Sequence, residues 1–136
     1  MISCTKRLRF SAGHRIFGHE SKCELLHGHN YRVEITATTD ELDPQGRVVD
    51  FGVIKKWVGE WIDEHWDHRF LLYQDDPMLA SAPPETGVIR VPFNPSAENL
   101  AQHLYGIAKS LLEGTGVRVA RVRVWETETC WADYSP

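Results

Sequence analysis

The residues most suited to chemistry in this sequence are histidines concentrated near its N-terminus. Of seven histidines in 136 residues, four lie between positions 14 and 29. In an extended chain, residues i and i+2 point to the same side, so the imidazoles of His27 and His29 can reach one point. The intervening Gly28 removes a side chain that would crowd the backbone there. His14 ends the preceding expected strand, and a hairpin between the two strands would bring it beside the other two rings.

Three neutral imidazoles can form a zinc site with an open fourth position, the arrangement of a catalytic rather than a structural zinc. Imidazole also binds copper, nickel and iron, so zinc is inferred from coordination chemistry and metal availability. The competing interpretation is three surface or core histidines without a metal. We predict that His14, His27 and His29 bind Zn²⁺, because a third histidine at a strand end and a nearby cysteine accompany the His-x-His pair.

Cys23 lies four residues before His27, and three roles are open to it: metal ligand, buried apolar residue or catalytic thiolate. A nearby dication and Lys22 would both stabilise the thiolate and lower the pKa of the thiol. A zinc site that includes the cysteine is a real competitor, since thiolate binds zinc well. Cys4 and Cys130 have no such neighbours, and packing is their expected role.

Two further acidic positions could take part in chemistry. Asp67 precedes His68, and a carboxylate beside a histidine can orient the imidazole and keep it basic. Adjacent residues on a helix do not face each other, so spacing alone favours a histidine that interacts with the helix dipole. Glu126 follows an apolar strand face, where it could accept two parallel hydrogen bonds from a planar amidine-like edge. The alternative for Glu126 is a solvated strand end or an ion pair with an arginine.

The hydrophobic periodicity predicts elements that position these residues. Residues 2–12 and 29–38 alternate as half-buried strands. Residues 117–125 predict another strand and 130–134 a short last one. Residues 74–95 hold five of the seven prolines and are expected to form a loop, with a short strand at 88–91.

Two helices are expected between these strands. Asp50 is a suitable N-cap for the first, which should end near 66–68. Its apolar stripe is expected to contain Ile54, Trp57, Val58, Trp61, Ile62 and His65. The second should begin near Ser96, with Asn94 or Ser96 as its cap, and stop at Gly114 and Gly116. The order of elements predicts an α+β domain spanning residues 1–136, with an antiparallel sheet and helices on one face.

Composition limits the class of protein. The hydrophobic fraction of 42% and the charged fraction of 25% are typical of a globular chain. Three widely spaced cysteines argue against a disulfide framework, and the N-terminus lacks a secretory signal, so we expect a cytoplasmic protein. No apolar run approaches the length of a membrane span. The net charge of −4 disfavours nucleic acid as a partner, although residues 1–32 hold six basic and two acidic residues.

Several motifs together resemble the 6-pyruvoyltetrahydropterin synthase and 6-carboxytetrahydropterin synthase family. The similarity runs nearly the whole length of the chain. Any single motif is modest support, but six in the family's order are specific. The matching segments are Phe10-Ser11-Ala12-Gly13-His14-Arg15, Cys23-Glu24-Leu25-Leu26-His27-Gly28-His29-Asn30-Tyr31, Val49-Asp50-Phe51, Asp67-His68, Pro95-Ser96-Ala97-Glu98-Asn99 and Glu126-Thr127.

The resemblance implies a tunnelling fold (T-fold), with a four-stranded antiparallel sheet and two helices on one side. It implies that subunits close into a barrel as trimers and that two trimers stack into a homohexamer. Closure of the sheets removes the edges that a lone four-stranded sheet would expose. Active sites in this family lie between subunits, which would let Cys23 and the Asp67-His68 pair meet across an interface.

The resemblance also implies roles for individual residues. The three histidines hold zinc, and Cys23 is similar to the catalytic base. Asp67 and His68 complete its proton-handling set, and Glu126 is similar to the pterin anchor. Ser96 stands where the family more often has threonine, at a segment that lines the pterin pocket. We further expect two basic residues of the N-terminal third to receive the triphosphate of the substrate, namely Arg15 and Lys22.

Three residues separate Cys23 from His27, and this short spacing resembles the 6-carboxytetrahydropterin synthase branch of the queuosine (deazapurine) pathway. The resemblance implies a lyase that converts 7,8-dihydroneopterin triphosphate to 6-carboxy-5,6,7,8-tetrahydropterin, with loss of triphosphate and acetaldehyde. Two alternatives stay open. One is a different enzyme on the same site, a 6-pyruvoyltetrahydropterin synthase or an aldolase-like activity. The other is a zinc- or pterin-binding protein without chemistry.

Overall fold

The computed structural model describes residues 1–18 and 24–136. Cys23 and Lys22 therefore lie outside the described residues. The strands are β1 (Ile2–His14), β2 (His27–Thr39), β3 (Arg69–Tyr73), β4 (Val88–Val91), β5 (Arg118–Trp125) and β6 (Trp131–Tyr134). The helices are α1 (Phe51–Ile54), a π-helical turn (Lys55–Gly59), α2 (Glu60–His65) and α3 (Ala97–Leu112), with 3₁₀ turns at Pro77–Ser81, Pro84–Thr86 and Glu113–Thr115.

The strands form one curled mixed sheet in the order β4-β3-β1-β2-β5-β6. The antiparallel part consists of β1, β2, β5 and β6, the four strands that the family resemblance implied. The count of four was wrong for the sheet as a whole, because β3 and β4 extend it with parallel pairing. The apolar segment 70–73, Phe-Leu-Leu-Tyr, carried a strand signal that the analysis of the sequence did not use.

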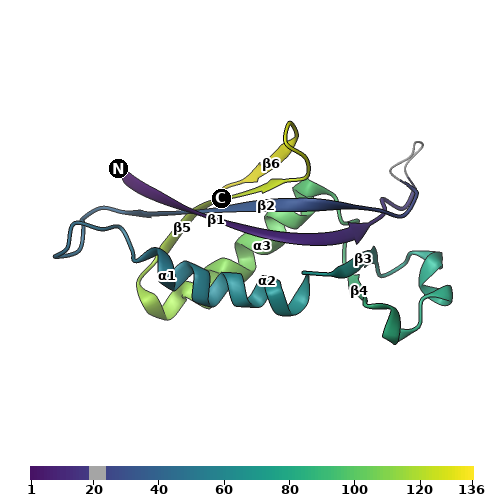
Figure 1. The fold of residues 1–136 in the computed structure, drawn as a ribbon. Coiled ribbons are helices and arrows are strands. Elements are labelled where there is room, and N and C mark those ends of the chain that lie inside the picture. The colour runs from purple at the N-terminus through teal and green to yellow at the C-terminus, as the bar shows by residue number, and fades with distance from the viewer. Residues whose placement is uncertain (19–23) are drawn as a thin grey trace.

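The helices lie together on one face of the sheet (Figure 1). Asp50 caps the first helical segment, since its carboxylate accepts a 2.8 Å hydrogen bond from the amide of Gly52. This segment continues through the π-helical turn to His65, and its buried positions recur every four residues, at Ile54, Val58, Ile62 and Trp66. Trp57 was expected in the apolar stripe but is 43% exposed. The wider π-helical turn leaves only the row from Ile54 to Trp66 facing the sheet.

The second helix, α3, packs on the same face. Ser96 is its cap, with Oγ accepting a 3.2 Å hydrogen bond from the amide of Asn99. The buried side chains of α3 are Ala97, Leu100, Ala101, Leu104, Ala108 and Leu112. They meet the inward side chains of the sheet, which include Tyr31, Val33, Ile35, Ala37, Val122 and Val124. Burial of this apolar surface is the main force that holds the helices to the sheet.

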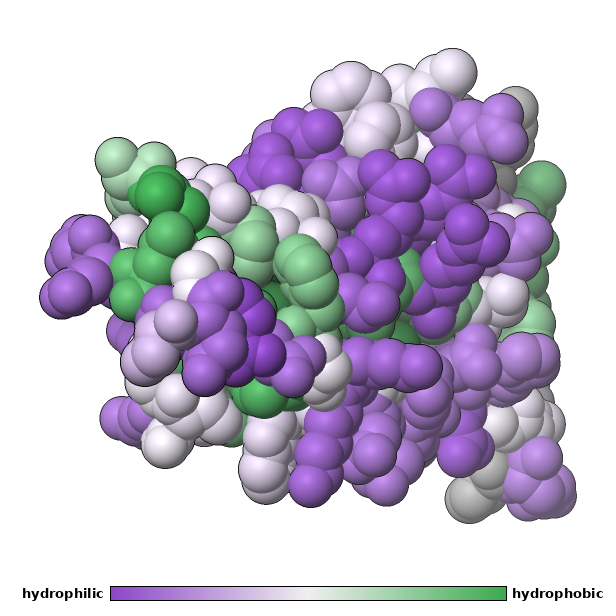
Figure 2. Space-filling view, turned by 60° about the vertical axis from the view of Figure 1, so that its left-hand side comes forward, coloured by the Kyte–Doolittle hydropathy of each residue, from purple (hydrophilic) through white to green (hydrophobic). Residues whose placement is uncertain are grey.

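On the opposite face of the sheet, which we call the open face, no helix is formed by residues 1–18 and 24–136 (Figure 1). Hydrophilic side chains predominate on the side of the molecule seen in Figure 2, with apolar ones in smaller patches. On the open face Glu34 is only 8% exposed, because Arg7, Arg121 and the indole N–H of Trp125 all contact its carboxylate. No helix within the described residues has both the length and the apolar composition to span a membrane.

Candidate active site

The three histidines of the N-terminal segment meet where β1 ends and β2 begins. His14 and His27 are cross-strand partners in the antiparallel register, and His29 lies two residues further along β2. One ligand atom from each ring and one carboxylate oxygen of Glu126 all lie within 4.8 Å of one another. The arrangement follows from strand geometry, because the three ring-bearing positions share one face of the hairpin.

Hydrogen bonds fix which nitrogen carries the proton in two of these rings. His14 Nδ1 is 2.7 Å from the carbonyl oxygen of Pro95, and His27 Nδ1 is 2.7 Å from that of Leu25. A carbonyl oxygen can only accept, so each Nδ1 donates and each neutral ring turns an unprotonated Nε2 into the cluster. These two Nε2 atoms are 3.0 Å apart. Two lone pairs at that distance repel unless a cation lies between them, as in metal sites whose outer ring nitrogens are held by carbonyls.

The surroundings of His29 fit the same interpretation. Burial lowers the pKa of His14 and His29 and so favours the neutral ligand form, although the charge of Glu126 opposes this shift. His29 Nε2 is buried and finds no hydrogen-bond partner among the described residues, although Glu126 Oε1 is 3.3 Å away. An unpartnered buried ring nitrogen is costly, and a metal ion would satisfy it. Imidazole and carboxylate donors at this separation suit Zn²⁺.

Glu126 lies directly after β5 and continues the inward parity of that strand. Its side chain is 27% exposed, so the carboxylate is reachable from solvent while it contacts His29. Two chemical roles suit this position: a fourth metal ligand, or an acceptor for a planar edge of a ligand bound beside the metal. From the sequence alone, only the second role and the solvated or arginine-paired alternatives were foreseeable, because the position of the carboxylate against the rings depends on the fold.

The side chains of Asp67 and His68 contact each other, although the side chains of adjacent residues within a helix point apart. The helix ends at His65, and His68 adopts the left-handed conformation with φ 59°, so its ring turns back to within 2.9 Å of Asp67. The expected interaction with a helix dipole was therefore wrong. Burial acts to raise the pKa of Asp67, but hydrogen bonds from the Ser11 amide and His68 outweigh it and hold this pKa below its ordinary value. The ring of His68 is 82% exposed.

Backbone contacts attach this pair to β1. Asp67 Oδ1 accepts a 2.9 Å hydrogen bond from the amide of Ser11, and the amide of His68 donates to the carbonyl of Ser11 at 2.7 Å. A left-handed conformation at a non-glycine residue costs free energy and persists only where its surroundings hold it. The two bonds to Ser11 supply that restraint, three residues before His14 of the histidine cluster.

Arg15 is engaged elsewhere than the sequence analysis expected. Its guanidinium makes a bidentate pair with Asp76, at 2.6 Å from Nε to Oδ2 and 2.7 Å from Nη2 to Oδ1. The side chains are 11% and 0% exposed, and Nη1 also donates to the carbonyl of Glu24 at 3.3 Å. These contacts join the end of β1 to two loops. They leave Arg15 little capacity for the triphosphate that was expected there.

Ser96 caps α3 as expected, with its hydroxyl oxygen accepting from the amide of Asn99. Its hydroxyl proton and its backbone stay available to a ligand, so a place beside the pterin pocket stays a prediction.

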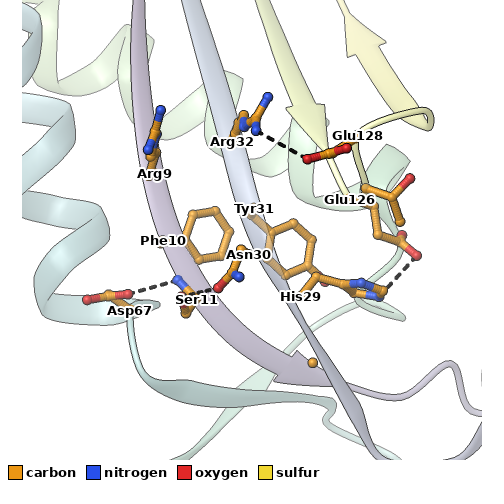
Figure 3. A pocket seen from close by; sticks show the side chains of 12 residues that line it. Arg9, Phe10, Ser11, His29, Asn30, Tyr31, Arg32, Asp67, Glu126 and Glu128 are labelled. Atoms are coloured by element: carbon orange, nitrogen blue, oxygen red, sulfur yellow. Dashed lines mark hydrogen bonds and ion pairs between the residues drawn. The ribbon is translucent and has the colours of Figure 1, made fainter.

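A cavity of about 730 Å³ lies beside the histidine cluster. Figure 3 shows His29 and Glu126 at one side of it, Asp67 at the other, and Arg9 and Arg32 further along the strands. In the sequence, these two arginines are distinguished only as members of a basic N-terminal third. Only the strand register shows that they lie opposite each other on the same face of the sheet.

The comparisons with known proteins agree with this site. A family model described as 6-pyruvoyl tetrahydropterin synthase matches residues 3–136. The chain belongs to this family. The resemblance drawn from the sequence motifs is therefore confirmed.

Curated relatives are similar over nearly their full length. A 6-carboxy-5,6,7,8-tetrahydropterin synthase of Rickettsia felis is 42% identical over 137 residues, which cover 98% of this chain and 99% of that protein. A protein of the same name from Aquifex aeolicus is 35% identical, covering 96% of this chain and 95% of its own. The expectation of an enzyme of the pterin synthase family is confirmed.

Solved structures match the fold. An uncharacterized protein from Wolinella succinogenes superposes with a TM-score of 0.90 at 25% identity, covering 98% of this chain and 97% of that one. The 6-pyruvoyl tetrahydropterin synthase of Caenorhabditis elegans superposes with a TM-score of 0.73 at 24% identity, covering 99% and 95%. The tunnelling-fold class is confirmed, with the two additional strands described above.

Proposed function

We propose that this protein is a zinc-dependent 6-carboxy-5,6,7,8-tetrahydropterin synthase. In this proposal it converts 7,8-dihydroneopterin triphosphate to the carboxy product, releasing triphosphate and acetaldehyde, in the queuosine pathway. The observation that carries the proposal is the cluster of three imidazoles and one carboxylate at the edge of a cavity of about 730 Å³. The names of the full-length relatives support the carboxy branch over the pyruvoyl branch.

We assign the metal ion to His14, His27 and His29. The tautomers of the first two leave Nε2 free to bind it, and Nε2 of His29 has no hydrogen-bond partner among the described residues. When bound there, Zn²⁺ would lower the pKa of the substrate hydroxyls. Glu126 would accept two hydrogen bonds from the pyrimidine edge of the pterin. This contact would orient the side chain of the substrate toward the histidine cluster.

Proton transfer is assigned to the remaining polar residues of the motifs. Cys23, as thiolate, would remove a proton from the substrate side-chain carbon held over it. His68, as imidazolium, would return a proton from Nε2. Its Nδ1 lies 2.9 Å from Asp67, which orients the ring so that Nε2 faces solvent. The ring of His68 is 82% exposed, so in an assembly it can reach a site formed with a neighbouring subunit.

We propose a homohexamer built from two trimers, as the family resemblance implies, and the unpaired strand edges support association of subunits. Within the described residues, the outer edge of β1 pairs with β3 only at Ala12–His14, and β6 pairs on one side only. Unpaired edges of this kind favour pairing with another chain. We propose that the β1 edge of one subunit meets the β6 edge of the next and closes a barrel. Light scattering coupled to size-exclusion chromatography measures the molecular mass in solution and so distinguishes a hexamer from a monomer.

Incubation of the zinc-loaded protein with 7,8-dihydroneopterin triphosphate tests the activity. We expect triphosphate, acetaldehyde and the carboxytetrahydropterin, identified by mass. A pyruvoyl product without acetaldehyde would instead assign the pyruvoyl synthase activity. If no pterin is consumed, the protein is a binding protein without chemistry.

Replacement of Cys23 by alanine tests its role as the base. Cys23→Ala should retain zinc and lose turnover, because three imidazoles suffice to hold the ion. Zinc content measured after dialysis distinguishes the alternatives. A loss of metal in this variant would make Cys23 a ligand and refute the assignment as base.

A further inference from the structure

The open face of the β1–β2 hairpin pairs side chains of complementary chemistry, with one exception. Cross-strand neighbours on this face include two threonine hydroxyls, an arginine with a glutamate, and a serine with an asparagine. These pairs are Thr5 with Thr36 at 2.9 Å, Arg7 with Glu34 at 3.2 Å and Ser11 with Asn30 at 2.7 Å. The pair between the last two is Arg9 with Arg32, two like charges in register.

Like charges directly opposite each other on a sheet are destabilising. No hydrogen bond or ion pair engages the side chain of Arg9 within residues 1–18 and 24–136. Arg32 has one long contact, 3.9 Å to Glu128, whose side chain is 89% exposed. A contact of that kind contributes little. The repulsion between Arg9 and Arg32 therefore lowers the stability of the free protein. A bound anion would relieve this repulsion.

The other arginines of this face lack such freedom. Arg7 and Arg121 both contact Glu34, and Arg123 makes a bidentate pair with Asp133. Each of them therefore has an acidic partner at 3.3 Å or less, although Arg7 and Arg121 share one carboxylate. The positive charge available to a ligand on the β1–β2 part of the open face is thus concentrated at Arg9 and Arg32.

Both arginines line the cavity that also reaches His29 and Glu126 (Figure 3). β5 pairs with β2 only from Arg32 onward, so the edge of β2 between residues 27 and 31 is open on that side. A ligand can therefore pass around this edge, from the histidine cluster to the open face. Arg32 lies three positions after His29, which corresponds to about 10 Å along a strand.

We propose that Arg9 and Arg32 form the binding site for the triphosphate group of the substrate. The inference rests on the proposed function, which places the substrate hydroxyls at the histidine cluster and leaves the triphosphate to extend away from it. Two guanidinium groups in register can each bind phosphate oxygens with paired N–H donors. This site takes the place of the expected site at Arg15, whose guanidinium is occupied by Asp76.

Binding of inorganic tripolyphosphate, measured by calorimetry on the zinc-loaded protein at fixed salt, tests the site without turnover. Arg9→Ala and Arg32→Ala should each weaken binding by about 10- to 100-fold, as expected for charge-assisted contacts. Arg90→Ala is the matched control, since Arg90 is exposed on β4 and outside the cavity lining. Glu128→Gln should strengthen binding, because it removes the carboxylate that competes for Arg32. Equal affinities in the two cavity variants and the control would overturn the proposal.

Comparison of orthophosphate with tripolyphosphate tests whether the site requires a chain of phosphates. We expect orthophosphate to bind much more weakly than tripolyphosphate, because it cannot engage both arginines along a chain. Equal affinity for the two anions would overturn the assignment to the triphosphate group. Thermal melting adds a structural check: without anion, Arg9→Ala and Arg32→Ala should melt no lower than the unsubstituted protein, since they remove a repulsion. A marked fall would assign the arginines a structural role instead.

Kinetics with the pterin triphosphate separate this inference from the proposed function. If the unsubstituted enzyme turns over, Arg9→Ala and Arg32→Ala should raise KM far more than Arg90→Ala does. Unchanged KM in both variants would overturn the arginine assignment while the proposed function stands. If the enzyme consumes no pterin but tripolyphosphate binding depends on both arginines, the proposed function fails and the anion site alone is supported.

Discussion

Replacing Glu126 by alanine separates the two roles that its position allows. As pterin anchor, its carboxylate would accept two charge-assisted hydrogen bonds, which together contribute about 1.5–3 kcal/mol. Glu126→Ala should then weaken pterin binding by about 10- to 150-fold, at 1.4 kcal/mol for each factor of ten. Zinc content should be unchanged, because the three imidazoles converge without help from the carboxylate.

The assay uses neopterin, which lacks phosphates, so that the anion site does not contribute. Its affinity is measured by fluorescence titration, and zinc is measured in the same dialysed samples. Glu128→Ala is a suitable control, because this carboxylate lies two residues further along the same turn and is 89% exposed. The control should bind neopterin and zinc like the unsubstituted protein.

Two results would refute this reasoning, and they are distinguishable. Unchanged neopterin affinity in Glu126→Ala would remove the anchor role. A loss of zinc would show that the carboxylate, which lies 3.3 Å from His29 Nε2, completes the coordination of the metal. In that case the open position needed for substrate hydroxyls would have to come from displacement of Glu126.

The remaining predictions concern stability. Asp76→Ala leaves the buried guanidinium of Arg15 unpaired and should lower the free energy of unfolding by about 3–5 kcal/mol in urea titrations. The Arg15 hydrogen bonds hold the pKa of Asp76 below its ordinary value, so this contribution is present above about pH 4 and lost as the pH falls further. Asp76→Asn should flatten that acid loss, and an unaltered pH profile would contradict the linkage. Gly13→Ala would overlap the ring of Phe70 and should cost about 1–3 kcal/mol, whereas Gly106→Ala meets nothing within 4 Å and should stabilise α3 by up to about 1 kcal/mol. Equal melting temperatures for these two glycine variants would refute the packing argument.

The convergence of the three histidines could be predicted from sequence because it needs only local rules. Alternation places His27 and His29 on one side of a strand, and antiparallel pairing of neighbouring strands places His14 beside them. The helix caps were predictable for the same reason, since Asp50 and Ser96 each bond an amide within three residues. The motifs then indicated the family.

The Asp67-His68 contact depended on where the helix ends, which the sequence analysis could place only near residues 66–68. Strand β4 was predicted and β3 was missed. Their parallel pairing could not be predicted, because such pairing is made over long separations and leaves no turn signature in the sequence.

The sequence by itself determined which side chains could bind a metal and which faces of the helices and strands would be buried, because these properties follow from periods of two and about 3.6 residues. Only the tertiary structure decided the partners of the charged groups. Arg15 meets Asp76 from 61 positions away, and Arg9 faces Arg32 only in the register that the hairpin adopts. A shift of one residue would place each arginine against a different neighbour, and the segment between β1 and β2 is too long for turn geometry to set that register.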